Sequence, residues 1–210
     1  MDKIPDQALQ IVLLNKKHDI DSFNSDNVDL NDFLKSNAIK DQEDRVSRTY
    51  LCFLGKTAVG YFSLVTDTLE VHVVEGNDGI KDYLYRKYPS IRIARLAVDQ
   101  KVKKKGIGKF MLLAAIGIAI DVSNKVGCRY ITVDSKPESI GFYEKNNFKV
   151  IEQYKHSDFP KMYLNMYPII AMMQPKESLY QKVEIIPKKI DWYNEDDAWK
   201  EYTAKRITRE

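Results

Sequence analysis

The chain has few of the residues that hold metals or build disulfide frameworks. Its 210 residues include only two cysteines and three histidines. Cys52 and Cys128 both lie in apolar, strand-like runs, so we expect reduced core side chains rather than a disulfide. The histidines stand in no metal-ligand spacing with Cys, Asp or Glu, which argues against a metal site.

Long hydrophobic runs and a strong charge imbalance are also missing. The longest apolar stretch, residues 110–120, is too short to span a bilayer and favours a buried helix. The first residues contain no apolar segment of a secretory signal, so we expect a cytoplasmic protein with no membrane partner. A net charge of +3 does not by itself indicate a nucleic-acid binder.

The most informative feature that is present is a basic, glycine-containing turn between an apolar strand and an apolar helix. The turn consists of Lys103, Lys104, Lys105, Gly106, Ile107, Gly108 and Lys109. Backbone N–H groups at a helix N-terminus have no partners within the helix, and the helix dipole adds positive potential there. Glycines carry no Cβ, so a phosphate can approach the amides closely. The segment therefore predicts a polyphosphate site.

Two common nucleotide-binding turns are excluded by single residues. A Walker loop needs a glycine where Lys103 stands and a hydroxyl residue where Phe110 stands. A dinucleotide fingerprint needs a third glycine, and Met111 occupies that position. The predicted phosphates therefore belong to another kind of cofactor.

The turn instead resembles the acetyl-coenzyme A turn of the GNAT N-acetyltransferases, which reads Gln/Arg-x-x-Gly-x-Gly/Ala after the fourth strand. Here Lys103 takes the first position, where it keeps the positive charge but lacks the planar fork of arginine. The resemblance extends over about residues 8–167 and implies acetyl-CoA as the cosubstrate. The residues that it places on the cofactor are Leu96, Ala97, Val98, Lys103, Lys104, Lys105, Gly106, Ile107, Gly108, Lys109 and Tyr143.

The order of the expected elements agrees with this family. Apolar and β-branched runs predict strands at residues 9–14, 48–54, 58–65, 91–98, 130–134, 148–154 and 161–166. Helices are expected at residues 26–44, from the turn to about residue 126, and at 138–146, with an irregular segment at 66–90. We therefore expect an α/β (α+β) GNAT fold, with a central mixed twisted sheet of six to seven strands and helices on both faces.

We expect the chain to divide at about residue 167. Residues 1–167 form the acetyltransferase domain, and residues 168–210 form a C-terminal extension. Within this extension, residues 195–209 predict a helix with acidic residues in its first turn and basic residues in its last. Its aromatic side chains either cover the domain itself or dock a partner, such as a second copy in a homodimer.

Two positions are expected to act on the thioester. The segment around Phe142 and Tyr143 resembles the family's helix after the fifth strand, which implies that Tyr143 donates a proton to the leaving coenzyme A thiolate. A phenol with a pKa of about 10 is protonated at neutral pH and suits this role. The alternative is a core aromatic beside Phe142. The resemblance also implies that a bulge in the fourth strand exposes a backbone N–H that polarises the thioester carbonyl, and we expect Val98 to be this donor.

Two further segments, residues 30–50 and 93–99, resemble one GNAT subgroup, the acetyltransferase toxins of type II toxin–antitoxin pairs. This resemblance implies that the acceptor is the α-amino group of an amino acid charged onto tRNA, and that an antitoxin protein is a partner. Other acceptors remain open, namely a small molecule or a protein amine. A regulatory module that binds acetyl-CoA without turnover, and a tRNA-binding protein without transferase activity, are further alternatives.

The expected fourth strand bears on the acceptor because it contains no carboxylate. Many GNAT enzymes carry a glutamate there as general base, whereas this chain carries Arg92 and Arg95. An α-amino group with a pKa of about 7.7–8.0 is already partly neutral at neutral pH, so it depends less on a general base than a lysine amine does. Acids of the irregular segment, Asp67, Glu70 and Glu75, could still reach the site.

Arginines in place of an acid favour an anionic acceptor such as tRNA. The candidate phosphate-contacting residues are Arg45, Arg48, Arg92 and Arg95. The alternative for each of them is solvated surface charge or an internal ion pair.

Overall fold

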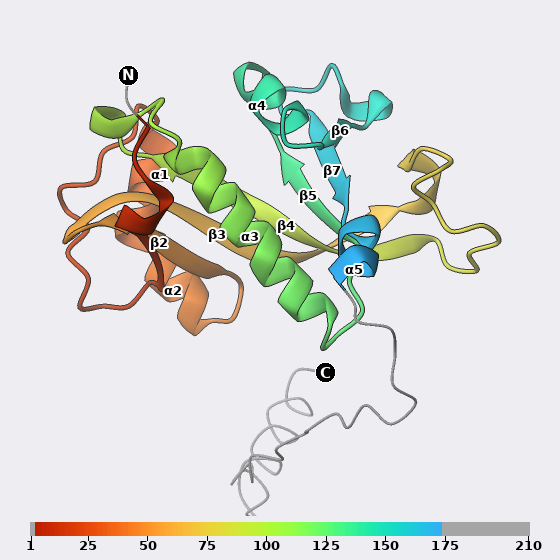
Figure 1. Ribbon diagram of the computed structural model, residues 1–210, viewed down its shortest axis with the longest axis horizontal. Coiled ribbons are helices and arrows are strands. Elements are labelled where there is room, and N and C mark those ends of the chain that lie inside the picture. The colour runs from red at the N-terminus through yellow and green to blue at the C-terminus, as the bar shows by residue number, and fades with distance from the viewer. Residues whose placement is uncertain (1–2, 174–210) are drawn as a thin grey trace, which may run out of the picture. The chain divides into compact units, whose positions relative to one another are not determined.

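The computed structural model describes residues 3–173, and the expected helix at residues 195–209 lies outside them. One sheet runs through this part of the chain, in the strand order β1-β2-β3-β4-β5-β7-β6 (Figure 1). Its strands are β1 (Leu9–Leu13), β2 (Arg48–Leu54), β3 (Thr57–Glu70), β4 (Lys87–Val98), β5 (Tyr130–Asp134), β6 (Lys149–Val150) and β7 (Lys161–Asn165). The helices are α1 (Val28–Asp32), a π-helical turn (Phe33–Asn37), α2 (Ala38–Glu43), α3 (Ile107–Ser123), α4 (Ile140–Glu144) and α5 (Tyr167–Met173). No helix within residues 3–173 has the length and apolar character needed to cross a membrane.

The sheet is mixed, as expected, because one of its strand pairs is parallel. β4 and β5 run parallel, and every other neighbouring pair is antiparallel. Their pairing joins only residues 90–93 to residues 130–133. Beyond that point β4 continues to Val98 beside β3, while β5 diverges from it (Figure 1). The two strands therefore part in a V, which creates the space for a site.

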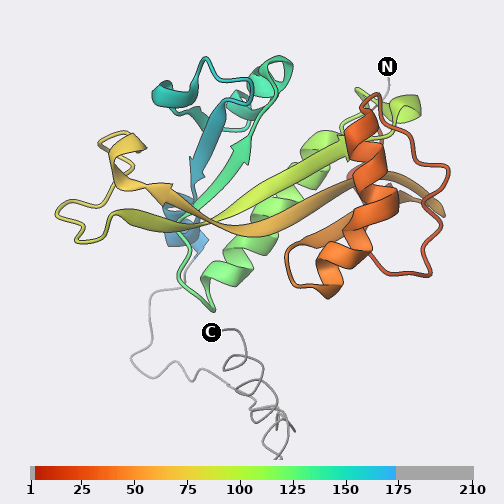
Figure 2. The same ribbon diagram turned by 180° about the vertical axis from the view of Figure 1, so that it is seen from behind.

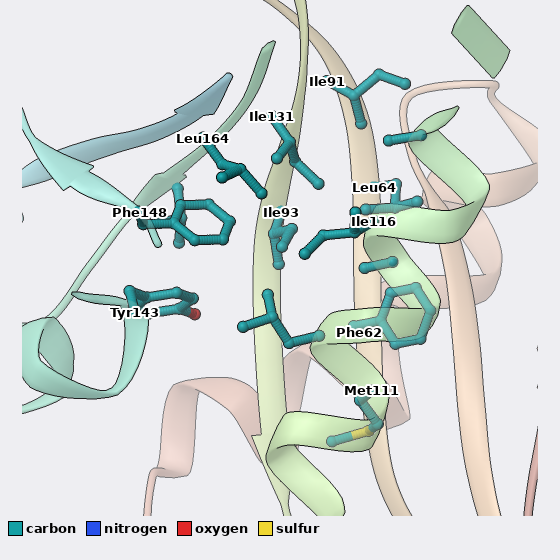
Figure 3. Close-up of a cluster of buried hydrophobic side chains, with 14 of the residues drawn as sticks. Phe62, Leu64, Ile91, Ile93, Met111, Ile116, Ile131, Tyr143, Phe148 and Leu164 are labelled. Atoms are coloured by element: carbon teal, nitrogen blue, oxygen red, sulfur yellow. The ribbon is translucent and has the colours of Figure 1, made fainter. Parts of the chain in front are cut away.

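Helices cover both faces of the sheet, which confirms the expectation. On one face α3 packs on strand residues such as Phe62 and Ile93 through Met111 and Ile116 (Figure 3). On the other face lie α1, the π-helical turn and α2 (Figure 2), which cover a second cluster around Tyr61. Successive strand residues point to opposite faces, so Tyr61 and Phe62 serve different cores.

Several helix and strand boundaries differ from those predicted from the sequence. β3 and β4 extend well into the segment that was expected to be irregular, because Leu69 and Tyr88 are buried partners across the two strands. The expected strand at residues 148–154 is wrong beyond β6, since the chain turns there into a short 3-10 helix (Glu152–Tyr154). The expected helix at residues 26–44 is interrupted by the π-helical turn. These differences leave the order of elements unchanged.

Candidate active site

A cleft of about 1040 Å³ opens where β4 and β5 part. Its walls come from β4, from the basic turn before α3, from the end of β5, from α4 and from the loop that leads into α1. The lining residues that these elements supply fall in the ranges 92–98, 103–109, 133–136, 138–143 and 25–30. The segments predicted to bind the cofactor are therefore brought together in one place.

The basic turn presents a row of free backbone donors to this cleft. Asp99 fixes its start, because the carboxylate accepts hydrogen bonds from the N–H groups of Lys101 and Asn24, each at 2.9 Å. Gly106 then caps α3 with a φ of +90°, a left-handed conformation that suits glycine. Within residues 3–173, the backbone N–H groups of residues 103–109 find no protein acceptor. The start of α3 is thus arranged to receive an anion.

The residues predicted to contact the cofactor line the cleft with one exception. Lys105 does not line it, and its carbonyl instead accepts the backbone N–H of Ile4 at 3.1 Å. Lys103 lines the cleft but is ion-paired with Asp26 from the loop before α1. A Cβ at Gly108 would stand 3.7 Å from the Phe142 ring, so the missing side chain leaves room between α3 and α4.

The backbone edge of β4 is also open along the cleft. The N–H of Asp99 donates to the carbonyl of Val59 on the β3 side. Because backbone groups alternate along a strand, the N–H groups of Val98 and Leu96 point away from β3, to the side where β5 has diverged. This edge can pair with an extended, amide-containing chain.

The bulge in β4 lies elsewhere than expected. Ser63 of β3 is opposite Arg95, and the next residue, Leu64, is opposite Ile93, so the extra residue in β4 is Ala94. The expectation that a bulge exposes the Val98 N–H is therefore corrected. Val98 faces the cleft through ordinary strand alternation, four residues away from the bulge. Strand periodicity in the sequence gives no signal for the position of such an insertion.

Tyr143 is both a core aromatic and a residue of the cleft wall. It is 6% exposed, and its ring packs against Phe142 and Phe148 at centroid distances of 5.0 and 5.4 Å. Its hydroxyl points from α4 towards β4 (Figure 3). Burial raises the pKa of the Tyr143 phenol, so the group stays protonated at neutral pH.

Of the four candidate arginines, two line the cleft. Arg92 is held by Asp134, with 2.8 Å between Nη1 and Oδ2, and Arg95 lies 3.5 Å above the centre of the Phe33 ring. Arg45 and Arg48 are exposed and lie outside the cleft lining. The structure thus brings Arg92 and Arg95 to the site and does not bring the other pair.

The acidic residues of the segment 66–90, which the sequence predicted to be irregular, do not reach the cleft. Asp67 is paired with Lys161, Glu75 with Lys149, and Glu70 with His72, all outside the lining residues. Four other carboxylates line the cleft, and the sequence reasoning did not select them as site residues. They are Asp26, Asp29, Asp134 and Glu138. For Asp134 a signal existed, because it is the last residue of the expected strand at residues 130–134.

Comparison with known proteins gives a consistent result. Residues 48–150 match the family model described as an acetyltransferase (GNAT) domain. A curated relative, the tRNA-acetylating toxin of Mycobacterium tuberculosis, is 27% identical over 133 residues, which cover 63% of this chain and 79% of the relative.

Solved structures show the same fold. The structure of AtaT complexed with acetyl-methionyl-tRNAfMet is similar with a TM-score of 0.71 and 19% identity, over 79% of this chain and 99% of that one. A tyrosine-to-phenylalanine mutant of AtaT, bound to the C-terminus of the antitoxin AtaR and acetyl-CoA, has a TM-score of 0.64 and 18% identity, over 80% and 99% of the two chains.

Proposed function

The chain carries a GNAT acetyltransferase domain, and from this membership we propose that it transfers the acetyl group of acetyl-CoA to the α-amino group of an aminoacyl-tRNA. The observation that carries the proposal is that β4 supplies Arg92 and Arg95, and no carboxylate, to the cleft wall at the far end from the phosphate turn. They stand on the strand where many family members carry an acid.

The cleft fits acetyl-CoA in one direction. The diphosphate suits the free N–H groups of residues 103–109, and the amides of the pantetheine arm suit the open edge of β4 at Leu96 and Val98. From Val98 back to Ala94 the strand rises about 13 Å. The thioester therefore belongs near the point where β4 and β5 part, and the cofactor supplies the activated acetyl group there.

Tyr143 is proposed as the proton donor at this end of the cleft. As the acceptor nitrogen bonds to the acetyl carbon, the carbon–sulfur bond breaks and the thiolate takes the phenolic proton of Tyr143. The proton lost by the amine restores the phenol through water. The raised pKa of Tyr143 keeps the proton available, and its hydroxyl faces β4 (Figure 3).

The acceptor is proposed from charge and from the relatives together. Arg92 is neutralised by its ion pair with Asp134, whereas Arg95 has no carboxylate partner within residues 3–173 and favours an anionic acceptor over polyamines or basic peptides. No carboxylate stands on β4 to deprotonate a lysine, so an α-amine with a pKa of about 7.7–8.0 is the better nucleophile. The Mycobacterium tuberculosis relative is named as a toxin that acetylates tRNA.

The test is an acceptor panel with labelled acetyl-CoA. The purified chain is incubated with total aminoacyl-tRNA, with uncharged tRNA, with a lysine-containing peptide and with spermidine. We expect label on aminoacyl-tRNA alone, and mass spectrometry of the released amino acid should locate the acetyl group on the α-nitrogen. Label that appears on the peptide or on spermidine, and not on aminoacyl-tRNA, contradicts the proposal.

An antitoxin partner and a cytoplasmic location complete the proposal. AtaT, which shares the fold, was solved with the C-terminus of the antitoxin AtaR, and charged tRNA is a cytoplasmic substrate. Expression of the chain alone should arrest growth, and coexpression of a small protein encoded beside it should relieve the arrest. Growth that is unaffected by an active enzyme would count against a toxin.

A further inference from the structure

The point where β4 and β5 part brings two specific residues together. The pairing of β4 with β5 ends at Ile93, which lies opposite Val133. The next residue of β4 is Ala94, which forms the bulge, and the next residue of β5 is Asp134. Asp134 therefore lies at the apex of the V, at the end of the cleft where the thioester is proposed to sit.

Within residues 3–173 the carboxylate of Asp134 makes one hydrogen bond, which leaves one of its oxygens free. Arg92 donates from Nη1 to Oδ2 at 2.8 Å. Oδ1 accepts no hydrogen bond from residues 3–173, and the Asp134 side chain is 38% exposed. Both residues line the cleft, so the free oxygen is available to a bound molecule.

The pair lies on the face of the sheet opposite α3. Ile93 points into the core that contains α3, so its neighbour Arg92 points to the other face. Arg95 is on this second face too, because it stacks on Phe33 of the π-helical turn. Arg92, Asp134 and Arg95 thus lie on the same face of the sheet, opposite the face that α3 covers.

We propose that Asp134 binds the α-amine of the acceptor through Oδ1 and that Arg92 is the positioning residue that fixes its carboxylate. This inference rests on the proposed function and names the group that holds the reacting amine. The charged ammonium pairs with Asp134 and loses one proton to water. The neutral amine then attacks the thioester while Asp134 accepts one of its N–H groups. The carboxylate that β4 lacks is supplied by β5.

Two other roles of Arg92 and Asp134 predict different effects on stability and on the acceptor KM. If Arg92 and Asp134 only fasten β4 to β5, their loss lowers stability and disturbs acetyl-CoA as much as the acceptor. If Asp134 acts only through its charge, its removal favours binding of polyanionic tRNA and lowers the acceptor KM. If Asp134 binds the amine directly, its removal instead raises the acceptor KM.

The experiment compares Asp134→Asn with Asp121→Asn in steady-state kinetics. Asp121 is a carboxylate of α3 that is paired with Lys125 outside the cleft lining, so its variant removes one negative charge without touching the site. We expect Asp134→Asn to raise the KM for aminoacyl-tRNA about tenfold, the size of one charge-assisted hydrogen bond. The KM for acetyl-CoA stays within about twofold. Asp121→Asn leaves both values near wild type.

A second measurement isolates the amine. The tRNA carrying the matching α-hydroxy acid keeps the nucleic acid and the ester but has no ammonium group. Its inhibition constant should be the same for wild type and Asp134→Asn. Arg92→Lys should retain more acceptor binding than Arg92→Ala, because lysine keeps a donor for Oδ2. An equal loss for the hydroxyacyl and aminoacyl forms overturns the proposal.

The same variants separate this inference from the proposed function. The methyl ester of the amino acid keeps the α-amine and dispenses with tRNA. If wild type acetylates the ester but no aminoacyl-tRNA, the proposed acceptor is wrong. If Asp134→Asn then raises the KM for the ester, the proposed role of Asp134 is still supported. If the KM for the ester is unchanged, this role is rejected.

Discussion

Lys103 of the phosphate turn is ion-paired with Asp26, which lies 77 residues earlier in the loop before α1. Both side chains line the cleft, so the carboxylate occupies a donor that the family resemblance assigns to the cofactor diphosphate. Asp26 is an anion at neutral pH, because its hydrogen bond to Lys103 lowers the pKa of the carboxyl group. The pair joins the loop before α1 to the turn before α3.

Asp26→Asn should therefore tighten the binding of acetyl-CoA. The substitution releases Lys103 from a competing anion, and exposed pairs of this kind change equilibria by about 1.5-fold to fivefold. Isothermal titration calorimetry with acetyl-CoA at pH 7 measures the change. Asp29→Asn is the control, because it removes a lining carboxylate with no resolved partner in residues 3–173. Equal tightening in both variants would show general electrostatics instead of competition for Lys103.

Tyr143→Phe should lower kcat about 100-fold or more while acetyl-CoA affinity stays within about twofold. Phenylalanine keeps the packing against Phe142 and Phe148 and removes only the proton donor. Stopped-flow detection of free thiol measures turnover, and calorimetry measures binding. Unchanged turnover would remove Tyr143 from the chemistry and leave it as a core aromatic.

The pH profile should have a single rising limb. The α-amine must lose a proton to attack, so kcat/KM rises with pH through about 7.7–8.0. Tyr143 must keep its proton, and burial raises the pKa of this phenol, so no decline follows at pH 9–10. A profile that falls between pH 8 and 10 would show a proton donor with an ordinary phenol pKa or a different donor.

Two glycines of the turn should respond to alanine in opposite directions. Gly106 has a φ of +90°, and a Cβ there would also stand 2.8 Å from Lys3 Cε, so Gly106→Ala should cost about 1–2 kcal/mol. Gly108 lies in α3 with only ordinary contacts around a Cβ, so Gly108→Ala should gain up to about 1 kcal/mol. Thermal melts without acetyl-CoA measure both. Equal shifts would mean that the conformation of Gly106 carries no strain for alanine.

Cys128→Ala should leave turnover unchanged. Burial raises the pKa of the Cys128 thiol to about 11 and that of Cys52 to about 12, so neither is a thiolate at neutral pH. Neither thiol lines the cleft. Initial-rate kinetics should give intersecting lines, as direct transfer in a ternary complex requires. Parallel lines that are lost in Cys128→Ala would indicate an acetylated cysteine intermediate.

Local sequence signals predicted the elements that position the cofactor. The basic turn was predicted because its glycines and lysines have a direct chemical meaning at a helix start. β5 was predicted with its observed ends, since Tyr130–Asp134 is an uninterrupted strand-like run. The end of β3 was missed, because what extends it is the burial of Leu69 against Tyr88, a contact between residues far apart in the sequence.

The reaction class could be predicted from the amino-acid sequence through the resemblance to GNAT enzymes, because the residues that carry it, the phosphate turn and the segment around Tyr143, are short motifs. Which charges meet at the cleft follows from the three-dimensional arrangement of the strands. Arg92 and Asp134 are 42 residues apart and become partners because β4 and β5 pair in one register and then part. Register and divergence depend on long-range packing, and single residues do not encode them.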